Sequence, residues 1–185
     1  MWHMVIYIFS PILILEIILL GFIILGSGKQ VNKIWPPEEE KSLSIYILML
    51  VFYLIIAGIL WIAIIERTNP FFTVNWFRYV GISLLLLGIC LYIWCRIYIS
   101  KKVEFGGKDQ LVTQGPYKYS RNPLYIADTL IFLGFAIFSN SMLVFILMIL
   151  LVATLLLLPL VEEPWLLKQY GKQYEDYKSG VPRYF

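Results

Sequence analysis

The chain has 185 residues, of which 60% are hydrophobic and 15% are charged, and its mean hydropathy is +0.78. Soluble domains contain roughly 45–50% apolar and about 25% charged residues, so this composition excludes an ordinary soluble domain. The net charge of +3 comes from basic residues between the apolar runs and requires no nucleic-acid partner. We therefore expect an all-α integral membrane protein.

Three long apolar runs predict the first three transmembrane helices. Met4–Gly26 contains one charged residue, Glu16, and Leu43–Ile65 contains none. As a helix, the second run is about 35 Å long and can cross a hydrocarbon core of about 30 Å. Trp76–Ile99 carries two arginines near its ends, where long side chains reach the interface. The first run lacks the basic start and the small-residue cleavage site of a signal peptide, so we expect a retained helix.

Two further apolar runs, Pro123–Phe138 and Ser141–Val161, predict a tight C-terminal helical hairpin because only two residues separate them. Asn122 suits the N-cap position and Pro123 the first helical position, so residues 101–122 are predicted to form a loop. The N–H groups at this helix start carry a partial positive charge and suit a phosphate or carboxylate. We predict five transmembrane helices in a single domain, residues 1–185: three helices in 1–100, then loop, hairpin and C-terminal helix in 101–185.

The distribution of Lys and Arg predicts the orientation in the membrane. With five spans, the loops 27–42 and 100–122 and the C-terminal tail share one side and hold twelve of these residues. The opposite side has Arg67 in its loop and Arg78 near a helix end. We therefore predict an extracytoplasmic N-terminus, a cytoplasmic C-terminus and a cytoplasmic start for the fourth helix.

Asp128 is unusual because it lies about one and a half turns into the predicted fourth helix. It shares a helical face with Tyr125, three residues earlier. An unpaired carboxylate is costly in a membrane, which favours a functional role. Two structural interpretations remain open: a carboxylate near enough to the interface to stay hydrated, or one paired with Arg121.

Glu162 and Glu163 follow the fifth apolar run and lie between two prolines. We expect them at a helix C-terminus, where the dipole disfavours carboxylates. They mark either a functional site or a solvated acidic pair at the membrane exit. From the predicted turn, Asn122 is about 26 Å away and Glu163 about 34 Å away. Both clusters are therefore expected on the cytoplasmic side, around one binding site.

The segment after the glutamates predicts an amphipathic C-terminal helix. Leu166, Tyr170, Tyr174 and Tyr177 recur at helical spacing, and the pattern ends near Gly180. Such a helix lies at the membrane interface or folds back as a lid. The tyrosine stripe is more typical of packing than of chemistry. The chain has one histidine, so we expect no His-rich metal centre.

Residues 109–185 resemble the integral membrane methyltransferases related to isoprenylcysteine carboxyl methyltransferase and the phospholipid N-methyltransferases. Their signature is an RHPxYxG-like start to one helix, an EE pair after the next, and a trailing FGxxYxxY…VPR segment. The matching segments here are RNPLYIA (Arg121–Ala127), Glu162-Glu163 and YGKQYEDYKSGVPRY (Tyr170–Tyr184), preceded by DQLVTQGPY (Asp109–Tyr117).

The resemblance implies S-adenosylmethionine as methyl donor, bound on the cytoplasmic side. The acceptor would be a prenylcysteine-like carboxylate, a lipid amine or another small lipophilic molecule. Methyl transfer depends on alignment of donor and acceptor and needs no covalent nucleophile. The residues implied to bind the cofactor are Gln110, Leu111, Val112, Tyr117, Asn122, Leu124, Tyr125, Glu162 and Glu163. Those implied to act in catalysis are Arg121 and Tyr125.

The chain departs from the family pattern at three places. Asn122 replaces the usual histidine, and Ala127 replaces the usual glycine, which suggests slightly looser packing. The carboxyl methyltransferases of the group carry an arginine about a turn before the glutamates, where this chain has Leu155–Leu158. This absence disfavours a prenylcysteine acceptor. Two alternative functions are an NADPH-dependent membrane reductase of the sterol-reductase type and a non-catalytic membrane protein that binds a ligand.

Overall fold

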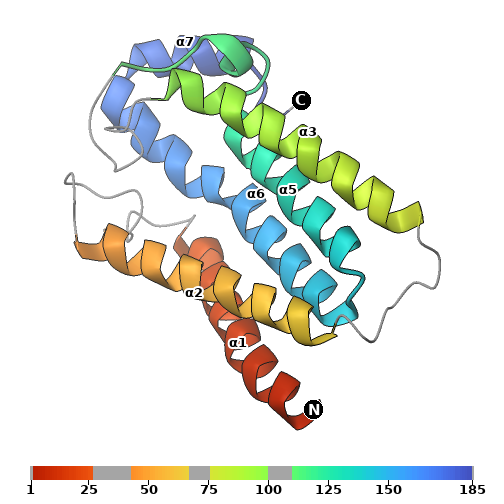
Figure 1. Ribbon diagram of the computed structural model, residues 1–185. Helices are drawn as coiled ribbons and strands as arrows, with labels where there is room; N and C mark the ends of the chain where they lie inside the picture. Colours follow the sequence, from red (N-terminus) through yellow and green to blue (C-terminus); the bar gives the residue numbers. More distant parts are fainter. Residues whose placement is uncertain (1, 27–42, 67–75, 100–109, 185) are drawn as a thin grey trace.

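A computed structural model describes residues 2–26, 43–66, 76–99 and 110–184 (Figure 1). All regular elements in these parts of the chain are helices, which confirms the all-α prediction. In chain order they are α1 (Trp2–Gly26), α2 (Leu43–Ile65), α3 (Trp76–Tyr98), the 3₁₀ helix η2 (Gly115–Lys118), α5 (Pro123–Ser139), α6 (Met142–Tyr170) and α7 (Lys172–Gly180). The basic residues of loops 27–42 and 100–108, on which the predicted orientation depends, lie outside the described residues.

Three helices are long and apolar enough to cross a membrane. These spans are Tyr46–Ile65 in α2, Trp76–Tyr98 in α3 and Met142–Tyr170 in α6. The apolar stretch Ile6–Gly21 of α1 and the whole of α5 are shorter. The membrane character of the chain is therefore supported by three helices, and the count of five spans stays a prediction.

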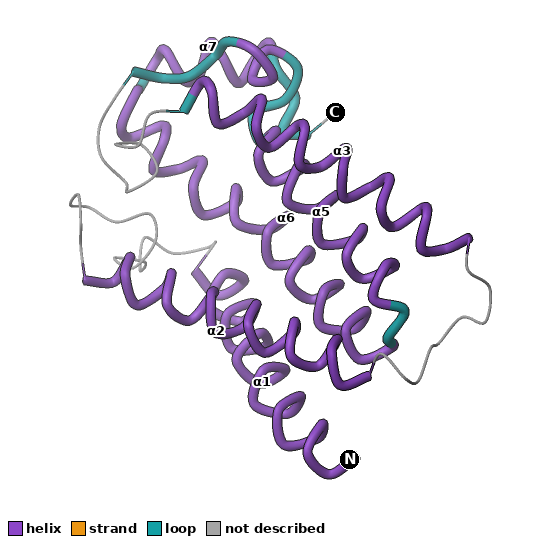
Figure 2. The backbone as a smooth tube through the Cα atoms, in the orientation of Figure 1, coloured by secondary structure: helices purple, strands orange, loops and turns teal. Residues whose placement is uncertain are grey.

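The helices form two groups on either side of α6 (Figure 2). On one side α5 lies beside α6, and α3 packs along α5. On the other side α1 and α2 cover the first half of α6, where Ile12, Ile59 and Leu147 belong to one buried core cluster. The ends of α3 and α6 and the start of α5 thus lie at the same end of the bundle, beneath η2 and α7.

Helices α3 and α5 touch backbone to backbone because glycines line their contact. A Cβ atom on Gly134 would lie 2.6 Å from the backbone nitrogen of Leu85. One on Gly88 would lie 2.8 Å from the backbone nitrogen of Ile131 and 2.9 Å from the carbonyl oxygen of Ala127. Small residues permit such close approach in membrane helices. The contact fixes the position of the first turns of α5, which carry the candidate site.

The connection from α5 to α6 is short and polar. Asn140 adopts a left-handed conformation, with φ of 55°, and its N–H donates to the carbonyl of Ile137. Ser141 caps α6 by accepting the N–H of Val144 at 3.2 Å. The same Ser141 hydroxyl donates to the carboxylate of Glu66 at the end of α2. The turn is therefore also tied to the neighbouring helix.

The fifth predicted helix is longer than the sequence suggested. Its apolar run, which contains Pro159, ends at Val161, but α6 continues through Pro164 to Tyr170. A proline removes one backbone hydrogen bond, and helices of membrane proteins tolerate this loss. The chain then turns at Gly171, with φ of 52°. Glu162 and Glu163 consequently lie inside a helix, so the expectation that they oppose a C-terminal dipole was wrong.

Candidate functional site

Two carboxylates of α6 meet the start of α5 at this end of the bundle. The Tyr125 hydroxyl, one turn into α5, donates to Oε1 of Glu162 at 2.5 Å. The two residues are separated by 37 positions in the sequence. A hydrogen bond to an ionised acceptor is stronger than one between neutral groups. The hydrogen bond between Tyr125 and Glu162 links α5 and α6 at the end of the bundle where the sequence predicts both polar clusters.

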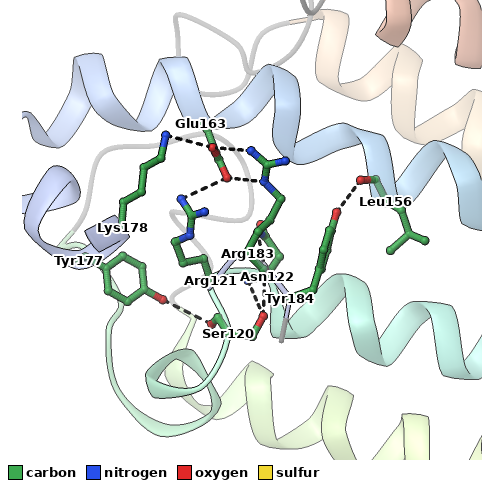
Figure 3. Close-up of polar contacts among 9 residues, drawn as sticks. All are labelled: Ser120, Arg121, Asn122, Leu156, Glu163, Tyr177, Lys178, Arg183 and Tyr184. Carbon is green, nitrogen blue, oxygen red and sulfur yellow. Dashed lines mark hydrogen bonds and ion pairs between the residues drawn. The ribbon is translucent and has the colours of Figure 1, made fainter. Parts of the chain in front are cut away.

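Glu163 is the centre of an ion-pair cluster (Figure 3). Arg183 donates to its carboxylate through Nε at 2.7 Å and Nη2 at 2.9 Å. Nη1 of Arg121 lies 3.2 Å from Oε1, and Nζ of Lys178 lies 3.5 Å from Oε2. The side chains of Glu163 and Arg121 are 8% and 9% exposed, so this pair is largely shielded from water. Three cations therefore surround one carboxylate.

Residues Val181–Tyr184, which we call the C-terminal strap, fasten the loop before α5. The carbonyl of Arg183 accepts hydrogen bonds from the Ser120 hydroxyl and the Asn122 amide, both at 3.0 Å (Figure 3). The N–H of Arg121 donates to the carbonyl of Pro182 at 2.9 Å. Asn122 does occupy the N-cap position, but its side chain makes no capping hydrogen bond. It binds the strap because the Arg183 carbonyl lies within reach.

Tyrosines enclose the cluster as neutral groups. The hydroxyl of Tyr177 donates to the carbonyl of Tyr117 at 2.7 Å, and that of Tyr184 to the carbonyl of Leu156 at 2.5 Å. Burial raises the pKa of Tyr177 and that of Tyr184 each to about 12. Burial also raises the pKa of Tyr117 well above its usual value. All three phenols are therefore uncharged near neutral pH and can pack against a cationic group.

The whole contact between α5 and α6 lies in a segment of the chain that matches a known protein family. The phospholipid methyltransferase family model matches residues 76–173. The match covers more than half of the chain and confirms the resemblance drawn from the motifs. This chain belongs to the phospholipid methyltransferase family.

Two curated proteins are similar to this chain at low sequence identity. The chain is 28% identical over 117 residues to the nickel-cobalt-cadmium resistance protein NccN of Alcaligenes xylosoxydans xylosoxydans, covering 60% of this chain and 52% of the relative. It is 29% identical over 106 residues to the cobalt-zinc-cadmium resistance protein CzcN of Cupriavidus metallidurans, covering 57% and 46%. The chain thus spans about half the length of the curated relatives it matches. No solved structure matches it significantly.

The structure of this phospholipid methyltransferase family member brings some of the implied site residues together. Arg121, Asn122, Tyr125, Glu162 and Glu163 form the polar cluster just described. The other implied residues belong to the segment before α5 or to its first turn. Tyr117 is buried, Leu111, Val112 and Leu124 are half-buried, and Gln110 is exposed. The three apolar side chains have no polar group with which to join the cluster.

Residue-by-residue reasoning did not assign a role to four cluster members: Ser120, Lys178, Arg183 and Tyr184. The family's VPR signature contained Arg183, so a signal for it was present. No comparable pattern pointed to Lys178, which reaches Glu163 from α7. In the parts of the chain that the structure describes, no three His, Cys, Asp or Glu side chains are grouped to hold a metal ion.

Proposed function

We propose that this protein transfers a methyl group from S-adenosylmethionine to a lipophilic acceptor at the cytoplasmic face of a membrane. The observation that carries the proposal is the hydrogen bond between Tyr125 and Glu162, which joins the two family signatures in space. The ion pair between Arg121 and Glu163 joins them a second time. Acceptors that remain compatible are a lipid amine, a prenylcysteine-like carboxylate or another small lipophilic molecule.

The polar groups of the cluster fit the cofactor's charges. Nε of Arg121 is buried and has no hydrogen-bond partner among the described residues, so it suits a carboxylate. The Glu162 carboxylate suits an ammonium group, and the neutral rings of Tyr125 and Tyr184 suit a sulfonium. When bound, the cofactor supplies an electrophilic methyl group on sulfur. The protein's own contribution is to bind, align and exclude water, which methyl transfer chiefly requires.

We further propose that the chain is a single membrane domain with five spans, α1 and α5 being the additional two. The proposed orientation has the N-terminus outside the cytoplasm and the cluster inside. Single cysteines introduced at Ser27 and at Ser179, in a background without Cys90 and Cys95, test it. Under the proposal, Ser27 and Ser179 both lie on the cytoplasmic side, so a membrane-impermeant maleimide labels either position only after the cells are opened. Labelling of intact cells at either position would contradict the orientation.

Isothermal titration calorimetry of the detergent-purified protein tests the cofactor assignment. We expect heat of binding with S-adenosylmethionine and with its demethylated product, and none with NADPH. Binding of NADPH alone would favour the reductase, and no binding of either sulfur nucleoside at millimolar concentration would exclude the proposal.

Replacement of Glu162 by Gln tests the site. It should weaken binding of the cofactor about 10- to 100-fold, because a charge-assisted hydrogen bond contributes about 1.5–3 kcal/mol. Glu175→Gln, on the exposed side of α7, is the matched control and should leave affinity unchanged. Unchanged affinity in Glu162→Gln would disprove the assignment of this residue.

The two relatives are named for metal resistance, and that description applies to those proteins. We carry over to this chain only the methyl-transfer chemistry of the family. Calorimetry with cobalt, nickel and cadmium chlorides on the same preparation would show whether the protein also binds a metal directly.

A further inference from the structure

The end of the chain lies across the polar cluster that the proposed cofactor site uses. We call residues 172–184, which comprise α7 and the C-terminal strap, the C-terminal lid. Three consecutive residues before α5 donate hydrogen bonds to it: Ser120 and Asn122 to the carbonyl of Arg183, both at 3.0 Å, and the N–H of Arg121 to the carbonyl of Pro182 at 2.9 Å (Figure 3). The lid therefore covers one side of Arg121 and Asn122.

The carboxylate of Glu163 is fully occupied while the lid is in place. Its Oε1 lies 2.7 Å from Nε of Arg183 and 3.2 Å from Nη1 of Arg121. Its Oε2 lies 2.9 Å from Nη2 of Arg183 and 3.5 Å from Nζ of Lys178. A carboxylate offers about four lone-pair sites, so none is left for the ammonium group of a cofactor. Glu163 instead fastens the lid to α6, and Glu162 stays available for the ammonium.

Arg121 is enclosed behind this contact, although part of its guanidinium group is unused. Its side chain is 9% exposed, and neither Nε nor Nη1 has a hydrogen-bond partner in the described parts of the chain. A buried N–H group without a partner is costly, so these two nitrogens favour an anionic ligand. A water-soluble ligand reaches so enclosed a group only when a neighbouring segment moves aside.

The lid is suited to this movement because few apolar contacts hold it. α7 contains no aliphatic side chain, and of its nine residues, all of which the structure describes, only Tyr174 is buried. The side chains of Arg183 and Lys178 are 36% and 49% exposed, and ion pairs of such groups compete with water. Gly171 joins α6 to α7 with φ of 52°, and a Cβ atom there would meet nothing within 4 Å. The connection thus has the space to act as a hinge.

We propose that the C-terminal lid gates the cofactor site: it opens about Gly171 to admit and release S-adenosylmethionine, and it closes when Arg183 pairs with Glu163. This inference rests on the proposed function and describes how its site is regulated. Opening exposes the unpaired nitrogens of Arg121 to the solution. Closing excludes water from the site, which favours methyl transfer. Because the lid controls passage, its state changes the rates of cofactor binding and release together.

A zero-length cross-link between Lys178 and Glu163 tests the gate without a mutation at the site. A water-soluble carbodiimide joins an amine to a carboxylate in direct contact, with loss of water, and these two groups are 3.5 Å apart. Peptide mass spectrometry identifies the linked protein. We expect binding and release of radiolabelled S-adenosylmethionine to slow by at least about tenfold in it. Lys178→Gln, treated in the same way, controls for other modified carboxylates and should bind at the same rate before and after treatment. Equal rates in linked and unlinked protein would overturn the gate and leave the cofactor assignment standing.

Replacement of Arg183 by Gln tests the gate in the opposite direction, because the neutral side chain no longer holds the lid to Glu163. Stopped-flow tryptophan fluorescence should show that the association and dissociation rate constants both rise at least about fivefold, while Kd changes less than about threefold. Lys172→Gln, on the exposed side of α7, is the matched control and should leave both rates unchanged. A rise in dissociation alone, or no change in either rate, would overturn the gate. Failure of the wild-type protein to bind S-adenosylmethionine would instead refute the proposed function.

Discussion

Arg183 binds the carboxylate of Glu163 through two nitrogens, at 2.7 and 2.9 Å, although Glu163 lies in α6 and Arg183 follows α7. The backbone carbonyl of the same arginine accepts hydrogen bonds from Ser120 and Asn122, just before α5. One residue therefore connects the loop, the strap and α6. The hydrogen bond to Glu163 raises the pKa of Arg183 above its usual value, so this arginine stays charged.

Replacement of Glu163 by Gln should destabilise the protein. The change leaves Arg121, which is largely buried, without its counter-charge. Breaking a buried ion pair costs about 3–5 kcal/mol, but Arg183 and Lys178 are partly exposed and can turn toward water. We therefore expect a loss of about 2–4 kcal/mol in the free energy of unfolding, measured by denaturation in mixed micelles. Glu175→Gln should change it by less than about 0.5 kcal/mol.

Replacement of Tyr125 by Phe should weaken cofactor binding. It removes the hydrogen bond that orients the Glu162 carboxylate, which we expect to lower cofactor affinity about tenfold. Tyr184→Phe makes the same chemical change but removes a bond to a backbone carbonyl. It should cost about 1 kcal/mol of stability and leave affinity within about twofold of wild type. Equal losses of affinity in the two variants, measured by calorimetry, would show that the Tyr125 contact has no special role.

Replacement of Gly134 by Ala should disrupt the contact between α3 and α5. The new Cβ would meet the backbone nitrogen of Leu85 at 2.6 Å, and a backbone atom cannot move aside as a side chain can. Overpacking of this kind costs about 1–3 kcal/mol. Thermal unfolding in detergent should therefore show a clear loss of stability. Gly21→Ala is the matched control: it meets nothing within 4 Å, and alanine favours a helix, so stability should be unchanged or slightly higher.

Alkaline pH should destabilise the region around Tyr177. Its pKa is raised to about 12 in the folded protein, so the unfolded chain loses this proton at lower pH. The contribution of Tyr177 to stability is therefore complete below about pH 10 and is lost as the pH rises toward 12. Unfolding measured between pH 9 and 12 should show a smaller pH-dependent loss in Tyr177→Phe than in the wild-type protein. Identical slopes would contradict this origin of the effect.

The sequence predicted the helices where a simple pattern decides their bounds. Leu43–Ile65 is uninterrupted and appears with the same bounds in α2. The start of α5 follows from Pro123, which suits a first helical position. The end of α6 did not follow, because the apolar run stops before Glu162, and Pro164 is a helix breaker by local rules. The surrounding helices override that rule, and a local pattern contains no information about such neighbours.

Part of the candidate site could be predicted, and part depends on contacts that no local pattern encodes. The distances of Asn122 and Glu163 from the turn predicted that both polar clusters lie on the same side of the membrane, and Tyr125 and Glu162 of these clusters do meet. The partner of Arg121 was open, and Glu163 rather than Asp128 is found there. Ala127 suggested looser packing, but its carbonyl still approaches α3 closely because the glycine there is Gly88, on the other helix.

The C-terminal strap is synthesised last among the segments of the polar cluster, so its contacts can form only late. Arg183 is made 63 residues after Ser120, the first group that it binds. At about 5–20 residues per second, that is a delay of about 3–13 s. During this interval α5 and α6 can insert and pack, but Arg121 and Glu163 remain unfastened by the strap. Assembly of the polar cluster is therefore a late, post-insertion step, and a ribosome that pauses between these two codons would prolong the lifetime of an inserted but unfinished protein.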